Sequence, residues 1–244
     1  MYPHRIRLRG PWCYVPLAGT LRTAAGELRH VSEKALPSGV MKLPCRWCDG
    51  GLGEFSGKVR FTRHFGSPER LDVHERVWLT VEGVTGSYEI NLNGKFVGHR
   101  QPGEERAEFA VTDLLHPRNT LNITIDAGAD GGIWGEVALE IRASAWLEHV
   151  VAESWSEGDA GFVRVRGDIK GESAGPLDLY AILGRYTVAQ ASATASGEFE
   201  LVSEPLPTDR WRGEESIRIE LMSGASAWYT LEAPVGFGAH GKTP

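Results

Sequence analysis

The segment SYEINLNGKFVGHR, residues 87–100, predicts a β-hairpin. Its first half alternates apolar and polar residues, so that three apolar side chains share one face of a strand: Tyr88, Ile90 and Leu92. Asn93 and Gly94 follow, and these residue types most readily adopt the positive φ angles of a two-residue hairpin turn. The segment therefore favours an antiparallel sheet with one buried face.

The same alternation recurs along residues 1–143. The predicted inward positions form three triplets: Val77, Leu79 and Val81; Leu121, Ile123 and Ile125; Val137, Leu139 and Ile141. Turn-forming residues such as Gly66-Ser67-Pro68 separate the strands. Because a single sheet would leave its apolar face in water, we expect two sheets packed as a sandwich.

After Arg142 the alternation restarts in a second block. Residues 148–235 contain seven plausible strands, a number typical of an immunoglobulin-like sandwich. The block has no cysteine pair to join its sheets, so it resembles the fibronectin-like kind. We therefore predict an all-β fold of two antiparallel β-sandwiches in tandem, with domains at residues 1–143 and 144–244.

Composition narrows the classes of function. The chain of 244 residues has a net charge of −6 at pH 7 and scattered basic residues, so a nucleic-acid partner is not expected. No apolar run reaches the roughly 18 residues that span a bilayer, and the start, MYPHRIRLRGPWCYVPLAG, lacks the apolar core of a signal peptide. We expect no membrane contact and a cytoplasmic location, or a periplasmic or secreted one if a leader precedes this sequence.

The three cysteines include one closely spaced pair, Cys45-Arg-Trp-Cys48. A two-residue gap occurs in half of a zinc ribbon and in redox pairs. A second ligand pair is missing, so we expect reduced thiols, no metal and no cofactor. A redox or metal role for Cys45 and Cys48 stays open at this point.

Five segments resemble, in this order along residues 6–143, the N-terminal sugar-binding-like sandwich of family 2 glycoside hydrolases: LRGPW, GKVRFTRHFGSPE, VWLTVEGVTGSYEINLNGKFVGHR, AEFAVTDLLHPRNTLNITI and GGIWGEVALEI. That family includes β-galactosidases, β-glucuronidases and β-mannosidases. The resemblance implies a galactose-binding-like jelly roll for the first block. The second block is similar to the immunoglobulin-like domain that follows in the family.

The resemblance also implies where catalysis would lie. In the family, a segment like Val235–Gly238 leads into a catalytic (β/α)₈ barrel of about 250 residues, whereas this sequence ends at Pro244. Retaining hydrolysis uses two carboxyl groups about 5–5.5 Å apart, and the family's acid/base glutamate usually follows an asparagine. None of the four asparagines here precedes a glutamate. We therefore expect no catalytic residues; as part of an enzyme, the chain would belong to a retaining β-glycosidase.

Two loops combine the residue types that bind sugars. Aromatic faces pack on the C–H side of a sugar ring, and carboxylate or guanidinium groups bond its hydroxyls. The candidates are Arg46, Trp47 and Asp49 in PCRWCDGGLGEF, and Asp130 and Trp134 in GADGGIWG. The resemblance implies that both loops face the barrel, although family members commonly have arginine where Gly135 stands. Alternatively, either tryptophan caps the core, with its indole N–H bonded to a carbonyl.

Two further aromatic residues are candidates for contact with a partner. Trp78 alternates with the inward-facing Val77 and Leu79, and Phe237 would pack on the barrel in the resembling enzymes. Three hypotheses follow: a noncatalytic carbohydrate-binding protein, a structural or assembly module that binds a protein or its own copies through sheet edges, and the noncatalytic part of a split or truncated β-glycosidase. Fold alone does not choose among them.

Overall fold

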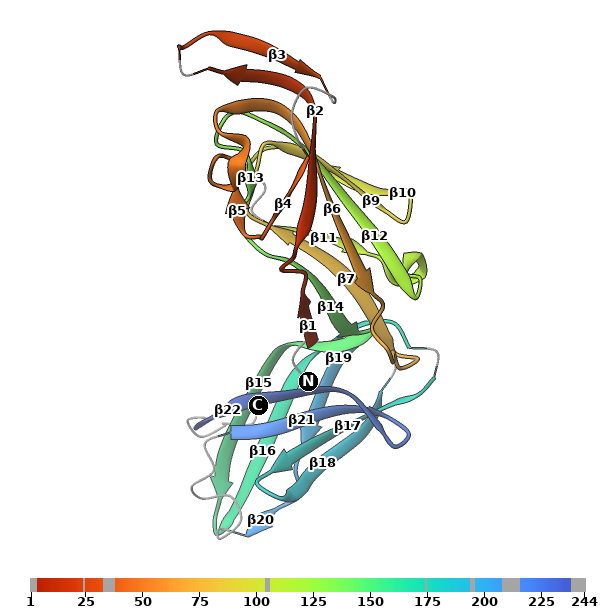
Figure 1. Ribbon diagram of the computed structural model, residues 1–244. Helices are drawn as coiled ribbons and strands as arrows, with labels where there is room; N and C mark the ends of the chain where they lie inside the picture. The colour runs from red at the N-terminus through yellow and green to blue at the C-terminus, as the bar shows by residue number, and fades with distance from the viewer. Residues whose placement is uncertain are drawn as a thin grey trace. The chain divides into compact units, whose positions relative to one another are not determined.

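The computed structural model describes residues 4–23, 25–32, 38–103, 106–173, 175–193, 196–207 and 216–237. These residues form an all-β chain with antiparallel sheets, which confirms the predicted fold class (Figure 1). Contacts within the chain divide it into two compact units. The first unit comprises His4–Leu71 and Arg76–Arg142, and the second comprises Asp72–Glu75 and the described residues from Ala143 onward. The described part has no helix that is long and apolar enough to cross a bilayer.

Three sheets make up the first unit. A seven-stranded sheet has the order β10-β9-β12-β6-β2-β3, with β4 also paired to β2. Its strands are β10 (Lys95–Arg100), β9 (Ser87–Leu92), β12 (Arg118–Ala127), β6 (Phe55–Gly66), β2 (Trp12–Arg22), β3 (Leu28–Ser32) and β4 (Gly39–Met41). A four-stranded sheet joins β1 (His4–Arg7), β14 (Val137–Ala143), β7 (Glu75–Glu82) and β11 (Arg106–Ala110) in that order. A small sheet joins β5 (Cys45–Arg46), β13 (Gly132–Ile133) and β8 (Val84–Thr85).

The predicted hairpin is present as β9 and β10. Its turn residues Asn93 and Gly94 have φ angles of 53° and 80°, as a two-residue turn of this kind requires. The Asn93 side chain also fixes the turn: Nδ2 donates to the Leu114 carbonyl at 2.8 Å, and Oδ1 accepts from the Thr120 N–H at 2.9 Å. Local turn chemistry and tertiary contacts therefore favour the same conformation.

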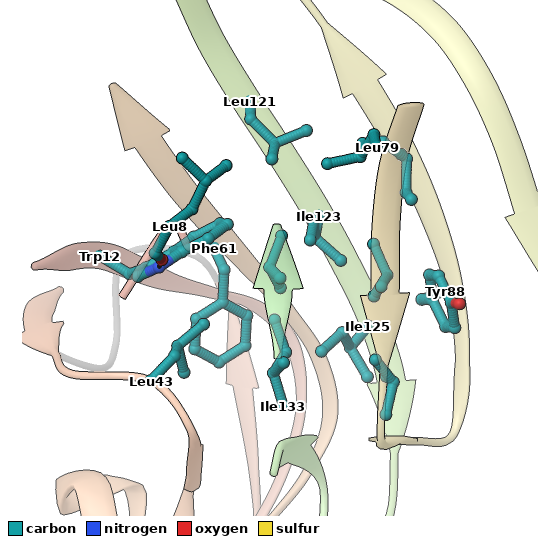
Figure 2. Close-up of a cluster of buried hydrophobic side chains, with 14 of the residues drawn as sticks. Leu8, Trp12, Leu43, Phe61, Leu79, Tyr88, Leu121, Ile123, Ile125 and Ile133 are labelled. Carbon is teal, nitrogen blue, oxygen red and sulfur yellow. Dashed lines mark hydrogen bonds between the residues drawn. The ribbon is translucent and has the colours of Figure 1, made fainter. Parts of the chain in front are cut away.

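Side chains from both larger sheets form the core of the first unit. All nine predicted inward residues are buried, and none is more than 9% exposed. Figure 2 shows Leu79 from β7 beside Leu121 and Ile123 from β12. The buried Trp12 indole N–H donates to the Leu8 carbonyl at 2.7 Å, so its polar atom is satisfied inside the core. The period-2 pattern therefore identified the buried faces correctly.

The four-stranded sheet carries an interlocked set of charges on its other face. Glu140, which is 3% exposed, accepts hydrogen bonds from Arg106 at 2.9 Å and from Arg142 at 2.6 Å. Arg5 lies 3.4 Å from the same carboxylate. Arg142 also donates two hydrogen bonds of 2.8 Å to Glu108. A carboxylate this buried is tolerated only with cations and donors around it, which explains why three arginines converge on one residue.

The second unit has a single path of strands in the order β18-β17-β21-β22-β15-β16-β19, with β20 paired to β16. Its strands are β15 (Ala145–Glu157), β16 (Ala160–Gly171), β17 (Leu177–Leu183), β18 (Tyr186–Ala193), β19 (Gly197–Val202), β20 (Leu206–Pro207), β21 (Ser216–Ser223) and β22 (Ser226–Phe237). All seven strands predicted for this block are present. β22 runs parallel to β15, with Val235 opposite Ala152. The apolar core of this unit is separate from that of the first.

A substitution at Ile123 tests which face of β12 is buried in the core of the first unit. It is fully buried and lies opposite Phe61 and Ile90 in the two neighbouring strands. We expect Ile123→Ala to lower the free energy of unfolding by about 2–5 kcal/mol, because it removes buried methyl groups and leaves a cavity. Urea unfolding measures this change. Thr124→Ala, at the next position on the outward face, should cost less than about 1 kcal/mol; equal effects would contradict the assignment of faces.

Glu108 gives the charge network a pH dependence. Hydrogen bonds from Arg142 lower the pKa of the Glu108 carboxyl, and Arg106 lowers it further. Such a group stabilises the fold above its unfolded-state pKa of about 4.3, and this contribution is lost as the pH falls through the folded-state pKa. We expect Glu108→Gln to be less stable than the wild type at pH 7, by a difference that shrinks below about pH 4.

Chemical unfolding at a series of pH values measures that difference. Glu89→Gln is the matched control, because Glu89 is exposed and has no ion pair among the described residues. Its effect should stay within about 0.5 kcal/mol at neutral pH. A Glu108→Gln effect that is constant from neutral to acid pH would show that the ion pair does not stabilise the fold.

Candidate functional site

The small sheet brings the two candidate loops together. Arg46 in β5 lies opposite Gly132 in β13, and Gly132 lies opposite Thr85 in β8. Paired residues of antiparallel strands direct their side chains to the same face, so Arg46 and Thr85 flank a glycine with their Cα atoms about 10 Å apart. The next residue of β13, Ile133, is fully buried in the core (Figure 2). One face of this sheet is therefore anchored, and the other carries the polar residues.

Trp47 holds the second loop in place. Its backbone N–H donates to the Gly131 carbonyl at 2.9 Å, and its indole N–H donates to the Ala129 carbonyl at 3.0 Å. The ring is 0% exposed and packs edge-on against Phe55, with the ring centroids 5.8 Å apart. This burial corrects the prediction that Trp47 offers a face to a sugar. The alternative describes it, because the ring caps the core and its N–H bonds a carbonyl.

Trp134 is the exposed aromatic residue of these loops. Its side chain is 53% exposed, and its indole N–H donates to Thr85 Oγ1 at 3.2 Å. Its backbone N–H donates to the Gly83 carbonyl at 2.8 Å. The ring lies close against Gly83, where an added Cβ would come within 2.9 Å of ring atom Cε3. These contacts fix the ring while about half of its surface faces solvent.

Three of the candidate residues carry charged groups. Arg46, Asp49 and Asp130 are all exposed. Within the described part of the chain, none of their charged groups has a hydrogen bond or ion pair. An exposed charged group without a protein partner exchanges water for a ligand at a smaller cost than one that must first break an ion pair. The two loops therefore present a guanidinium and two carboxylates. Asp130 lies four positions before Trp134 in the chain, and Arg46 lies on β5 opposite Gly132 of β13.

Gly135 stands where the resembling enzymes commonly have arginine. A Cβ on this residue would overlap the Glu82 carbonyl, and it would lie 2.9 Å from the Gly83 backbone nitrogen. The Gly83 carbonyl accepts hydrogen bonds from Trp134 and Gly135. This close approach of two backbones leaves no room for a side chain at residue 135.

Thr85 and Gly83 are site residues that the sequence did not indicate. Both lie in the segment VEGVTG, between the predicted strand that ends near Val81 and the predicted hairpin that begins at Ser87, where the sequence predicted no site residue. Their role depends on the pairing of the two-residue strands β8 and β13, which brings residues some fifty positions apart into contact. Strands this short carry no periodic signal, and only the glycines of the segment hint at a close approach.

The two predicted partner-contact residues lie elsewhere. Trp78 is half-buried on the charged face of the four-stranded sheet, and the Arg142 guanidinium carbon is 5.2 Å from its ring centroid. The predicted alternation with Val77 and Leu79 is confirmed. Phe237 ends β22, where its backbone lies opposite Ser154 in β15; its side chain is outside the described part. Contact with a partner stays a prediction for both.

The cysteine pair lies in the first loop. Cys45 is half-buried and Cys48 is exposed. Burial raises the pKa of the Cys45 thiol, and the nearby Asp49 and Cys48 raise it further, so this thiol is protonated at neutral pH. Among the residues that the structure describes, no three His, Cys, Asp or Glu side chains gather closely enough to hold a metal ion.

Comparison with solved structures shows where this fold also occurs. The chain is 17% identical to a β-glucuronidase from Bifidobacterium dentium, with a TM-score of 0.58 over 97% of this chain and 49% of that one. A β-glucuronidase from Ruminococcus gnavus, solved with D-glucuronic acid, is 14% identical, with a TM-score of 0.56 over 97% and 46% of the two chains. A protein from Bacteroides fragilis, provisionally described as a β-galactosidase, is 16% identical, with a TM-score of 0.55 over 97% and 41%.

These similarities establish a shared fold. The chain spans less than half the length of each of these glycoside-hydrolase structures. No protein-family model matches the chain, and no curated protein matches it. At 14–17% identity, a shared fold does not show that two proteins bind the same ligand. A proposal about the ligand must therefore rest on the residues of the site.

A substitution at Gly131 tests whether the Trp47 ring packs on the second loop. A Cβ at this position would overlap the Trp47 ring. We expect Gly131→Ala to displace the ring and lower the free energy of unfolding by about 1–3 kcal/mol, because the site is already filled. Gly128→Ala is the matched control in the same turn, where a Cβ would meet only Asp130 Oδ1 at 3.4 Å. Urea unfolding compares the two; equal stabilities would show that Trp47 does not pack on this loop.

Proposed function

We propose that this chain is a noncatalytic carbohydrate-binding protein that resembles the accessory domains of family 2 glycoside hydrolases. Its two compact units would be the two predicted sandwich domains, and Trp134 would be its sugar platform. The observation that carries the proposal is an aromatic ring that is half-exposed and yet fixed by Thr85 and Gly83, on the small sheet that also carries Arg46. The charged groups of Arg46 and Asp130 have no partner among the described residues.

The chemistry of the site suits a sugar ring. A pyranose presents C–H groups on one face, which pack on a flat indole such as that of Trp134. Its hydroxyl groups need both donors and acceptors, and the guanidinium of Arg46 and the carboxylate of Asp130 supply them. The Thr85 hydroxyl already bonds the indole, so it positions the ring. Because the ring is held before the ligand arrives, little side-chain ordering opposes binding.

A second proposal is favoured by a different observation. The chain spans less than half the length of the β-galactosidase and β-glucuronidase structures that share its fold. The chain would then be the noncatalytic part of a β-glycosidase whose catalytic domain lies outside this sequence. An assembly role, through Trp78 or the sheet edges, stays a third proposal.

Replacement of Trp134 tests the sugar platform. A glycan array identifies the best ligand, and calorimetric titration then compares the wild type with Trp134→Ala. We expect the Kd to rise about tenfold, because the stacking surface is lost while the charged groups remain. Trp146→Ala is the matched control, since Trp146 is also exposed (36%) but belongs to the second unit; its Kd should not change.

Two results would overturn the proposal. Equal affinities of Trp134→Ala and the wild type would remove the site assignment. Turnover of aryl β-glycosides by homogeneous protein would contradict the claim that the protein is noncatalytic. A blank array would favour an assembly role or the β-glycosidase fragment.

A further inference from the structure

Cys45 and Cys48 form a closely spaced pair in the first candidate loop. Cys45 begins β5, and Cys48 begins the turn Cys48–Leu52 that follows this strand. Both thiols are free. Two cysteines that are separated by two residues have the spacing of dithiol pairs that are oxidised and reduced reversibly.

The backbone bends between the two cysteines. Trp47 has a φ of −70° and a ψ of −25°, which lie in the right-handed helical region. The carbonyl of Trp47 then accepts hydrogen bonds from the backbone N–H groups of Gly50 at 3.2 Å and Leu52 at 3.0 Å. A fully extended chain would hold the Cα atoms of residues 45 and 48 about 10 Å apart. The bend shortens this span toward the range of about 4.4–6.8 Å that a disulfide bridges.

The titration of Cys45 supports the closeness of the two thiols. Burial raises the pKa of the Cys45 thiol, and negative charges on Asp49 and Cys48 raise it further. A like charge has this effect on a neighbouring acid only at short range. The Cys48 sulfur therefore lies near the Cys45 sulfur.

The two thiols differ in their access to solvent. Cys48 is exposed, whereas Cys45 is half-buried, lies opposite the buried Ile133 and packs against the core of the first unit. The Cys45 thiol also donates a hydrogen bond to the Arg46 carbonyl at 3.0 Å. Because the thiolate is the reactive form, the exposed Cys48 is the thiol that a reagent in solution meets first. Cys45 is shielded from that reagent but lies beside Cys48.

We propose that Cys45 and Cys48 are a dithiol–disulfide redox site, which a small disulfide such as glutathione disulfide oxidises. The Cys48 thiolate attacks one sulfur of glutathione disulfide, which breaks the S–S bond, forms a mixed disulfide and releases one glutathione thiolate. The Cys45 thiol gives its proton to that thiolate and attacks the Cys48 sulfur, which forms the Cys45–Cys48 bond and releases the second glutathione. The protein loses two electrons and two protons, and glutathione disulfide gains them.

Proximity favours the internal disulfide over a lasting mixed disulfide. Cys45 attacks within the same chain, so its effective concentration exceeds that of free glutathione. Cys13 provides the contrast, because it is also exposed but its neighbours in the sheet are Thr62 and Val40. A glutathionyl group on Cys13 would have no paired thiol in the same turn to displace it.

Mass spectrometry of the full chain tests this site. The protein is incubated with glutathione disulfide, alkylated with iodoacetamide and digested. We expect the segment that contains Cys45 and Cys48 to have lost two hydrogens and to carry neither an alkyl nor a glutathionyl group. Cys13, the matched control in the same digest, should carry one or the other. Dithiothreitol should restore two alkylated thiols to the pair.

Single variants in a Cys13→Ser background test the order of the two steps. Cys45→Ser should keep a stable glutathionyl group on Cys48, because no second thiol displaces it. Cys48→Ser should react with glutathione disulfide about tenfold more slowly than Cys45→Ser, because its remaining thiol is half-buried and more often protonated. Far-UV circular dichroism confirms that both variants are folded.

Four results would overturn the proposal. The pair could stay reduced while Cys13 is modified, or the pair could retain a glutathionyl group in the wild type, which would show that no internal disulfide forms. Cys48→Ser could react as fast as Cys45→Ser, which would contradict the assigned order. Oxidation could instead join two chains, which electrophoresis without reductant detects, and the exposed thiol would then pair between copies.

Discussion

The candidate site depends on the buried ring of Trp47. The backbone N–H of Trp47 donates a hydrogen bond to the Gly131 carbonyl, and its indole N–H donates one to the Ala129 carbonyl. The ring occupies the space that a side chain at residue 131 would need. These contacts fix the backbone just before β13, and β13 in turn pairs with β5 and β8. Trp134 follows β13 directly and is 53% exposed, whereas Trp47 is fully buried. The two tryptophans have separate roles, one as an anchor and one as a surface.

Much of the fold could be predicted from the sequence, because long alternating segments report a buried face directly. The hairpin around Asn93-Gly94 and all nine inward residues of the first unit follow from period-2 patterning and turn chemistry. The site could be predicted only in part. The two loops were identified by residue type, but which tryptophan faces solvent depends on contacts between distant two-residue strands, and Thr85 has no local signature.

The proposed sugar-binding surface lies outside the buried core of the first unit. On the charged face of the four-stranded sheet, three arginines already pair with Glu140. Trp134 follows the small third sheet directly and is 53% exposed. The fold also occurs in much longer glycoside hydrolases at 14–17% identity, and a fold alone does not define a function.

Fluorine NMR of protein labelled with 5-fluorotryptophan tests the central claim most directly, because each of the eight tryptophans gives its own resonance. Single Trp→Phe variants assign the signals of Trp47 and Trp134. The account predicts that Trp134 shows a solvent isotope shift in D₂O and moves on titration with the best glycan from the array, whereas Trp47 does neither. A glycan that binds and shifts Trp47 but not Trp134 would contradict the account, since the anchor would then be the surface.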